Sequence, residues 1–215
     1  MHQETEEWEN NRLVKRITDP EILRQLRAVR QKVLDTGCNI NLCFALQGDD
    51  FIKDSEFQDQ IDFIDIMLAI LTTDTPGNYC AVQYGQTTYR ISPLTEDKET
   101  FLTTLRETRR VGGFDTNIAG ALGYTGFQLR ARTEDANKII ILGDGLESVG
   151  FLPRRIARRI RKDGTDISAV AIGGYSTAAL YDITRDYNKI VEIEEFFKLA
   201  EIINGLVVDV CGFDL

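Results

Sequence analysis

Apolar and polar positions alternate along the chain in blocks that predict strands separated by helices. The block from Ile40 to Leu46 is almost continuously apolar, which is typical of a strand covered on both faces of a parallel sheet. Further strand-like blocks lie at 79–84, 87–91, 138–142, 167–172 and 190–193. Only Gly85-Gln86 separates the second and third blocks, so we expect these two strands to form an antiparallel hairpin at a sheet edge.

Between these strands, apolar residues recur at three- and four-residue spacing, which predicts helices. The first helix begins at Asp19-Pro20, with Asp as N-cap and Pro in the first helical position, and ends at Gly37. The other helices are expected near 57–71, 96–109, 117–130, 151–162, 176–186 and 194–203, the last ended by Asn204-Gly205. This alternation predicts an α/β fold: a doubly wound, mostly parallel six-stranded sheet with one antiparallel edge strand and helices on both faces.

The length of 215 residues suits one domain with a single core. Residues 1–18 contain four glutamates and few apolar residues, so we expect a flexible acidic lead-in over 1–18 and a single domain over 19–215. The first twelve residues lack the basic and then apolar pattern of a signal peptide. No stretch approaches the roughly 18 to 20 apolar residues that a membrane span needs, so no span is expected.

The net charge of −9 argues against broad binding to nucleic acid or to an anionic membrane, because the long-range field repels polyanions. In contrast to the negative net charge of the whole chain, the segment Pro153–Lys162 contains six cations in ten residues. Its outward residues Arg154, Arg155, Arg158 and Arg159 are candidates for contact with a polyanion. A solvated helix face, whose long side chains cover apolar surface, explains the same pattern.

The four cysteines allow three pairings. Cys38 precedes the first strand and Cys211 lies near the end of the chain, so a bond between them would tie together the two ends of the domain. We expect this bond and, with it, an extracellular or secreted location; a cytoplasmic protein with free thiols is the alternative. Cys43 and Cys80 fall within predicted strands, where buried cysteine usually acts as a small apolar residue, so we expect free thiols there, with a second disulfide as the alternative.

Three polar turns carry the candidate chemistry. They are Gln47-Gly48-Asp49-Asp50-Phe51, Gly112-Gly113-Phe114-Asp115-Thr116 and Gly143-Asp144-Gly145. Because carboxyl ends of parallel strands meet at one sheet edge, we expect Asp49, Thr116 and Asp144 to lie close together. The turns lack the glycine spacing of phosphate-binding loops, and paired carboxylates repel phosphate unless a cation lies between them. The site, if functional, suits a cation.

These turns resemble the metal-ion-dependent adhesion site of von Willebrand factor type A domains. Residues 46–52 align without gaps with the family's L-D-G-S-G-S-I, 112–116 resemble G-G-x-T with one extra residue, and 142–145 resemble L-T-D-G. The resemblance extends from about Cys38 to Cys211. It implies a Rossmann-type three-layer fold and a role in adhesion or protein binding.

In the family, two serines, a threonine and two aspartates hold Mg²⁺ or Mn²⁺ and leave one position open for an acidic group of the partner. Thr116 and Asp144 keep the family's residues, whereas Gln47 replaces the first aspartate. Asp49 and Phe51 replace the two serines. The resemblance therefore implies a degenerate site, with Asp49, Thr116 and Asp144 as candidate ligands for Mg²⁺, Mn²⁺ or Ca²⁺.

An interpretation without metal is also open. Phe51 would fill the pocket, while Asp49 and Asp50 would cap the following helix, where negative charge is favourable. In either case Thr116 is expected to be the N-cap residue of the helix that begins at Asn117.

Catalysis has little support in the sequence. The only histidine is His2, which excludes histidine-based triads within the predicted domain. Phosphoryl chemistry at Asp49, Asp50 and Asp144 would lack a Lys or Arg in the adjoining loops. We therefore predict a non-enzymatic module that binds a protein or extracellular-matrix partner through the carboxyl edge of the sheet, with metal dependence weakened or lost. A metal-independent scaffold subunit of an intracellular complex is the alternative.

Overall fold

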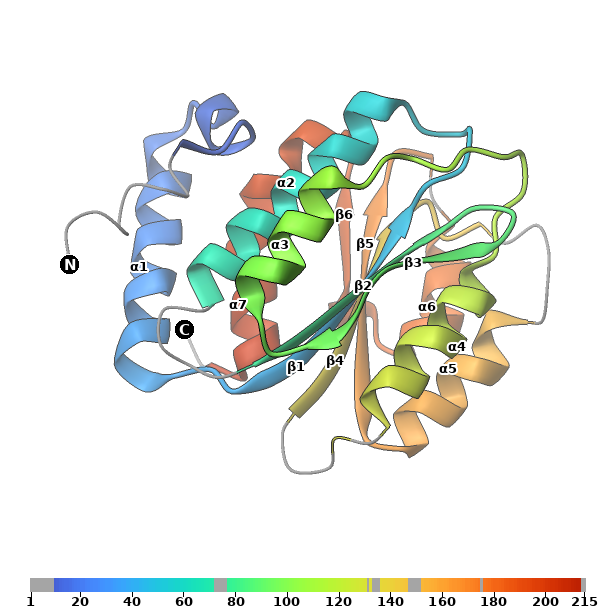
Figure 1. The fold of residues 1–215 in the computed structure, drawn as a ribbon. Helices are drawn as coiled ribbons and strands as arrows, with labels where there is room; N and C mark the ends of the chain where they lie inside the picture. Colours follow the sequence, from blue (N-terminus) through green and yellow to red (C-terminus); the bar gives the residue numbers. More distant parts are fainter. Residues whose placement is uncertain are drawn as a thin grey trace.

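A six-stranded sheet with helices on both faces forms the protein (Figure 1). The computed structural model describes residues 10–71, 77–130, 132, 136–146, 152–174 and 176–213. The strands are β1 (Ile40–Gln47), β2 (Asn78–Tyr84), β3 (Thr88–Thr95), β4 (Ala136–Gly143), β5 (Thr165–Ile172) and β6 (Ile190–Ile193). Their order is β3-β2-β1-β4-β5-β6, and only β2 and β3 pair antiparallel. The predicted fold class and edge hairpin are confirmed.

The helices form two layers, one on each face of the sheet (Figure 1). One layer contains α1 (Pro20–Thr36), α2 (Asp54–Leu71), α3 (Lys98–Glu107) and α7 (Ile203–Cys211). The other contains α4 (Ile118–Leu129), α5 (Pro153–Lys162) and α6 (Thr177–Thr184). Short 3-10 helices are η2 (Val14–Arg16), η3 (Tyr187–Lys189) and η4 (Phe196–Ile202). As predicted, the Asp19 side chain caps α1 by accepting from the N–H of Glu21, and Gly37 ends the helix with φ 75°.

The central strand β1 is buried along its whole length. Leu42, Phe44 and Leu46 belong to the core on the α1, α2, α3 and α7 side. Cys43 and Ala45 belong to the core on the side of α4 and α5. Because both faces are covered by apolar side chains, the polar residues of this strand are confined to its two ends.

The amino ends of three strands are joined by a ladder of asparagine side chains. Asn78 in β2 donates from Nδ2 to Oδ1 of Asn41 in β1 at 2.7 Å, and Asn41 donates to Oδ1 of Asn137 in β4 at 2.9 Å. These residues are register partners across the sheet. The ladder satisfies the side-chain amide of Asn41 at the edge opposite the predicted site, while Oδ1 of Asn78 has no hydrogen-bond partner among the described residues.

The segment just before α1 packs more closely than the expected lead-in. Leu13 and Val14 are buried in the core, and Arg12 pairs with Asp59 and Asp62 of α2 at 2.5 and 2.7 Å. Local composition did not reveal these partners because they lie on a helix nearly fifty residues away along the chain. Residues 1–9 of the proposed lead-in lie outside the described residues.

The end of the chain also differs from the prediction. The expected helix over 194–203 is instead the 3-10 helix η4, and the α-helix that follows, α7, runs through Asn204 and Gly205. These two residues lie in the first turn of α7, while Leu206, Val207 and Val210 are buried. Burial of this apolar face outweighs the poor helix propensity of Asn and Gly.

Both pairs of cysteines form disulfides. The expected Cys38–Cys211 bond is present, with 5.3 Å between the Cα atoms. The expectation of free thiols at Cys43 and Cys80 is wrong, since these residues are register partners in β1 and β2 and are bonded, with Cα atoms 4.5 Å apart. Two disulfides indicate an oxidising location. Among the described helices, none combines the length and apolar character needed to cross a membrane.

We predict that the Cys38–Cys211 bond is a major contributor to stability. Replacing both residues by serine should lower the free energy of unfolding by about 5 kcal/mol, because the bond closes a loop with sequence separation 173. Urea unfolding of the wild type and the double variant measures the difference. Alkylation of all four thiols in the unreduced protein, detected by mass spectrometry, would contradict both the bonds and the expected location.

Candidate functional site

The candidate site lies at the carboxyl edge of the sheet, where the loop after β1 meets the loop before α4. The N–H of Asp50 donates to the carbonyl of Gly113, and the N–H of Gly112 donates to the carbonyl of Gly48, both at 2.8 Å. Gly112 has φ +73°, and a Cβ there would lie 2.9 Å from Oδ1 of Asp50. Glycine is therefore required for this close approach of the two loops.

The structure brings together the three residues predicted to gather here. Thr116 donates from its hydroxyl to Oδ2 of Asp49 at 2.7 Å. The amide nitrogen of Gln47 lies 3.1 Å from Oδ1 of Asp49 and 3.2 Å from Oδ2 of Asp144. Asp49 is thus bonded to Thr116, and the Gln47 amide donates to the carboxylates of both Asp49 and Asp144.

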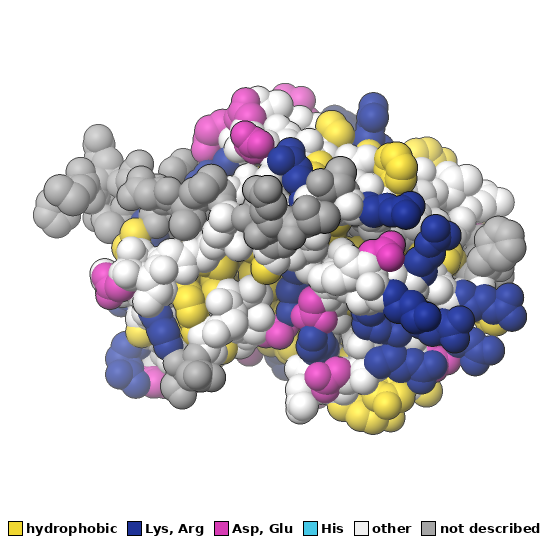
Figure 2. Space-filling view, turned by 90° about the horizontal axis from the view of Figure 1, so that it is seen from below, with side chains coloured by type: hydrophobic (Ala, Val, Ile, Leu, Met, Phe, Trp, Pro, Cys, Tyr) yellow, Lys and Arg dark blue, Asp and Glu magenta, His cyan; other side chains and the backbone are white. Residues whose placement is uncertain are grey.

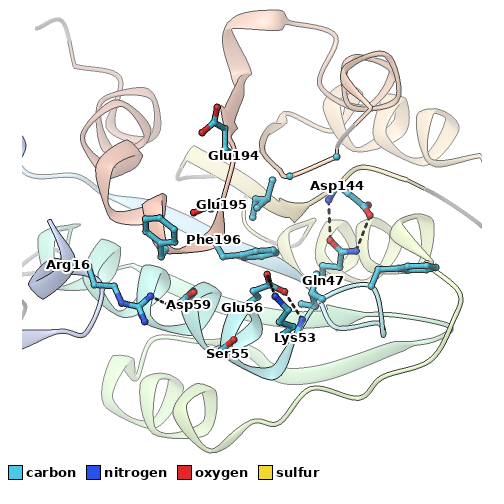
Figure 3. A pocket seen from close by; sticks show the side chains of 16 residues that line it. Arg16, Gln47, Lys53, Ser55, Glu56, Asp59, Asp144, Glu194, Glu195 and Phe196 are labelled. Atoms are coloured by element: carbon cyan, nitrogen blue, oxygen red, sulfur yellow. Dashed lines mark hydrogen bonds and ion pairs between the residues drawn. The ribbon is translucent and has the colours of Figure 1, made fainter.

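Gln47 is held in this orientation from two directions. Its backbone N–H donates to Oε1 of Gln60 at 3.0 Å, and Nε2 of Gln60 donates back to its carbonyl at 2.9 Å. Its side-chain oxygen accepts from the N–H of Asp144 at 3.1 Å, and its NH₂ group lies beside the carboxylate of Asp144 (Figure 3). Gln60 was missed in the sequence analysis. The available signal was a glutamine directly before Ile61 on the apolar face of α2.

The metal-free interpretation of the first loop is wrong in two respects. Phe51 is 64% exposed, so it does not fill the pocket. Asp49 accepts from the N–H of Phe51 at 3.1 Å and Asp50 accepts from the N–H of Gly113 at 3.0 Å, so neither caps α2. That helix is instead capped by Glu56, whose carboxylate accepts from the N–H of Lys53 at 2.6 Å.

The expected N-cap role of Thr116 is also wrong. The N-cap residue of α4 is Asn117, whose side chain accepts from the N–H of Gly120 at 2.7 Å. Thr116 is buried, and its hydroxyl bonds with Asp49 instead. Thr116 lies next to the start of a helix, which made capping a reasonable prediction. Its hydroxyl instead forms the hydrogen bond with Asp49 in a different loop.

Arg110 is a second residue that the sequence analysis missed. Its Nη1 donates to the carbonyl of Asp49 and to Oδ1 of Asp50, both at 2.7 Å, and its Nε donates to Oδ1 of Asp54 at 2.7 Å. Hydrogen bonding by Arg110, followed by that from the N–H of Gly113, lowers the pKa of Asp50. Arg110 lies two residues before the loop that begins at Gly112, and its guanidinium donates to three acceptors.

Burial has the opposite effect on Asp49, whose side chain is fully buried. Burial raises the pKa of Asp49, and the nearby charge of Asp144 adds to this shift. The hydrogen bonds from Thr116, Gln47 and the N–H of Phe51 act against it without reversing it. A negative charge on Asp49 is therefore disfavoured in the folded protein.

A cavity of about 550 Å³ opens beside the site, between the start of α2 and the segment joining β6 to η4 (Figure 3). Its lining contains more acidic than basic side chains. The acidic residues are Glu56, Asp59, Asp144, Glu194 and Glu195, and the basic ones are Arg16 and Lys53. Each of the two basic groups lies close to a lining carboxylate: Arg16 is 3.5 Å from Asp59, and Lys53 is 3.9 Å from Glu56. The cavity is therefore negatively charged on balance.

Exposed apolar side chains surround the site. Phe114 is 80% exposed, Phe51 64% and Leu146 48%. Each belongs to a different one of the three loops that meet at the sheet edge. Large exposed apolar side chains gathered on one surface are typical of a surface that binds another molecule.

A doubly wound sheet with converging polar loops at its carboxyl edge places the protein among the open α/β domains. Residues 41–205 match the von Willebrand factor type A domain, and the chain belongs to this family. Domains of the family are typically adhesion or protein-binding modules and are usually non-enzymatic.

Solved structures with the same fold include proximal thread matrix protein 1 from the mussel byssus, with 20% identity and a TM-score of 0.70. The match covers 80% of this chain and 48% of that one, so this chain spans about half the length of the mussel protein. A structure of the same mussel protein with a zinc-occupied MIDAS motif has a TM-score of 0.73. BatB from Bacteroides thetaiotaomicron matches at 13% identity and TM-score 0.67, covering 82% of this chain and all of that one. No curated protein matches the chain.

We predict that the charge on Asp49 destabilises the fold. The folded-state pKa of Asp49 is raised, so at a pH between the ordinary pKa of aspartate and this raised pKa the folded protein binds more protons than the unfolded chain. The free energy of unfolding therefore falls as the pH rises through this range. Asp49→Asn should therefore raise the melting temperature at pH 7, by roughly 2–4 °C for each kcal/mol relieved. This gain should vanish near pH 3, where the carboxyl group is neutral in both states.

Asp50→Asn is the matched control, since the same change at Asp50 removes a charge whose pKa is lowered by Arg110. It should lower the melting temperature at pH 7. Thermal unfolding by circular dichroism from pH 3 to pH 8 measures both variants, and a decrease for Asp49→Asn at pH 7 would refute the assignment.

Proposed function

We propose that this domain is a non-enzymatic module that binds a protein or extracellular-matrix partner through the carboxyl edge of the sheet. The observation that carries the proposal is the rim formed by Phe51, Phe114 and Leu146 around a buried polar centre. Interfaces gain most of their affinity from a few large side chains that become desolvated, and aromatic residues are favoured among them. Three separate loops supply such side chains here.

We further propose that metal dependence is weakened or lost. A hard divalent cation needs a shell of oxygen ligands, whereas the group that faces both carboxylates here is the NH₂ of Gln47. The Thr116 proton is directed at Asp49, and the raised pKa of Asp49 disfavours its charged form. As arranged, the donor set does not fit such an ion. Residual binding of Mg²⁺, Mn²⁺ or Ca²⁺ would involve Asp49, Thr116 and Asp144.

The chemistry of the partner follows from this loss. In the family's intact site, as the resemblance implies, the metal attracts an acidic group, but here the neutral amide of Gln47 lies between the carboxylates, and the half-buried Asp144 is the one that faces the partner. The neighbouring cavity is also negatively charged, with Glu194 and Glu195 added to Asp144. We propose that the partner contributes apolar and cationic side chains rather than a carboxylate.

The location is proposed to be extracellular, which favours a matrix or cell-surface partner over an intracellular complex. Both disulfides support an oxidising compartment. The mussel protein that shares the fold is named as a thread matrix protein, but at 20% identity this likeness carries the fold alone. The scaffold alternative would require free thiols.

Binding should depend on the aromatic rim. In solid-phase assays with immobilised fibrillar collagen, fibronectin and laminin, we expect at least one to bind the wild type. Phe51→Ala and Phe114→Ala should each weaken that binding by roughly tenfold or more, as expected for central aromatic contacts. Phe127→Ala is the matched control, because Phe127 is 73% exposed on α4, away from the edge. Equal losses for all three variants, or no binding to any matrix protein, would contradict the proposal.

Metal titration tests the weakened site separately. By calorimetry, the wild type should show no saturable binding of Mg²⁺ or Mn²⁺ tighter than about 100 μM. The triple variant Gln47→Asp, Asp49→Ser, Phe51→Ser restores the family's residues and should gain binding, which Asp144→Ala in that background should abolish. Tight binding by the wild type that is lost in Asp144→Ala would show that the site remains functional.

A further inference from the structure

A strongly basic surface lies on the opposite side of the sheet from α1 and α2. The exposed residues of α5 are cations: Arg154, Arg155, Arg158, Arg159 and Lys162. Their spacing places them on one stripe about 12 Å long, since the helix rises about 1.5 Å per residue. Ala157 and Ile160 are buried on the other side of the helix. This stripe, together with Arg130 and Arg185, is called the basic face below.

Neighbouring helices widen the stripe. Gly126 of α4 packs so closely on α5 that a Cβ there would lie 2.6 Å from the side chain of Ile160. This packing places Arg130, at the end of α4, near Asp163 at 4.0 Å, while Arg185 follows the end of α6. Figure 2 shows Lys and Arg side chains gathered over the side of the molecule where these helices lie.

The positive charge of the basic face is poorly neutralised within the described part of the chain. Arg185 pairs with Asp182 at 3.1 Å, whereas Arg154 reaches the same carboxylate only at 4.0 Å and Arg130 reaches Asp163 only at 4.0 Å. Among described residues, Arg155, Arg158 and Arg159 have no carboxylate within 4.0 Å. In a protein with net charge −9, such a concentration of unpaired guanidinium groups raises the electrostatic free energy unless an anion compensates it.

Arg161 gives independent support for a concentration of positive charge on this side of the molecule. Burial lowers the pKa of Arg161, and the positive charge of Arg185 lowers it further. Its buried Nη1 has no hydrogen-bond partner among the described residues. The charge of Asp166 opposes this shift but has a smaller effect than that of Arg185.

We propose that the basic face binds a sulfated polysaccharide. Planar guanidinium groups donate two parallel hydrogen bonds to an oxyanion such as sulfate, which lysine cannot do. The helix α5 contains no aromatic residue, whereas protein interfaces usually centre on aromatic anchors, so an acidic protein is a poorer fit. The two disulfides indicate an oxidising compartment, where sulfated polysaccharides are available polyanions and nucleic acids are not the usual ones.

The test uses the whole chain and heparin as the sulfated probe. Calorimetry at several NaCl concentrations should show binding that weakens as salt rises, because condensed counterions are released. Arg155→Gln, Arg158→Gln, Arg159→Gln together should weaken binding at least about tenfold and reduce the salt slope by about 2. The control with the same change in charge, Lys15→Gln, Arg24→Gln, Arg27→Gln, alters exposed cations around α1 and should bind like the wild type.

Desulfated heparin, a single-stranded oligonucleotide and vesicles containing phosphatidylserine distinguish the sources of negative charge. We expect none of them to bind as tightly as heparin. Equal or tighter binding of any of the three, equal losses in both triple variants, or no heparin binding at 50 mM NaCl would overturn the proposal. These outcomes do not depend on whether a partner binds at the sheet edge, because that proposed surface is formed by other loops.

Discussion

The constraint on which the structure depends is that its central sheet is covered by helices on both faces. A strand in that position can carry polar side chains only at its ends, because a polar group in the middle would be buried without partners. β1 obeys this rule along its whole length. Asn41 completes an asparagine ladder at one end, and Gln47 joins two carboxylates at the other. The gathering of polar side chains at the sheet edge is thus a consequence of how the core is built.

At that edge, one neutral amide takes the central position between two acidic groups. An amide nitrogen offers two protons but only a small part of a positive charge, so it can link Asp49 and Asp144 without neutralising them. Burial of Asp49 makes this imbalance costly, and the raised pKa reports that cost. Arg110 supplies full positive charge nearby, but it is directed to Asp50 and Asp54. The loops are therefore joined mainly by hydrogen bonds, and the surface keeps a negative character.

The parts of the molecule that could be predicted from sequence are those with local causes. Apolar runs identified the strands, Gly85-Gln86 identified the hairpin, and the polar turns identified which residues gather at the edge. The parts that could not be predicted depend on contacts between distant segments. Whether Cys43 meets Cys80 depends on strand register, and Gln60 and Arg110 reach the site from elements that the motifs do not include. The continuation of α7 through Gly205 likewise depends on the burial of the residues after it.

The Cys38–Cys211 bond has a mechanical consequence. Its two cysteines lie immediately before β1 and at the end of α7, so the bond connects the points where the sheet-containing part of the chain begins and ends. If tension were applied at residues on either side of that part, a covalent link would carry the load, and β1 to α7 would not be stretched. Only α1 and the segment before it, which lie outside the disulfide-closed part, would unfold under this tension. Under shear, the part of the chain between the two cysteines would not extend, and its surfaces would keep their shape.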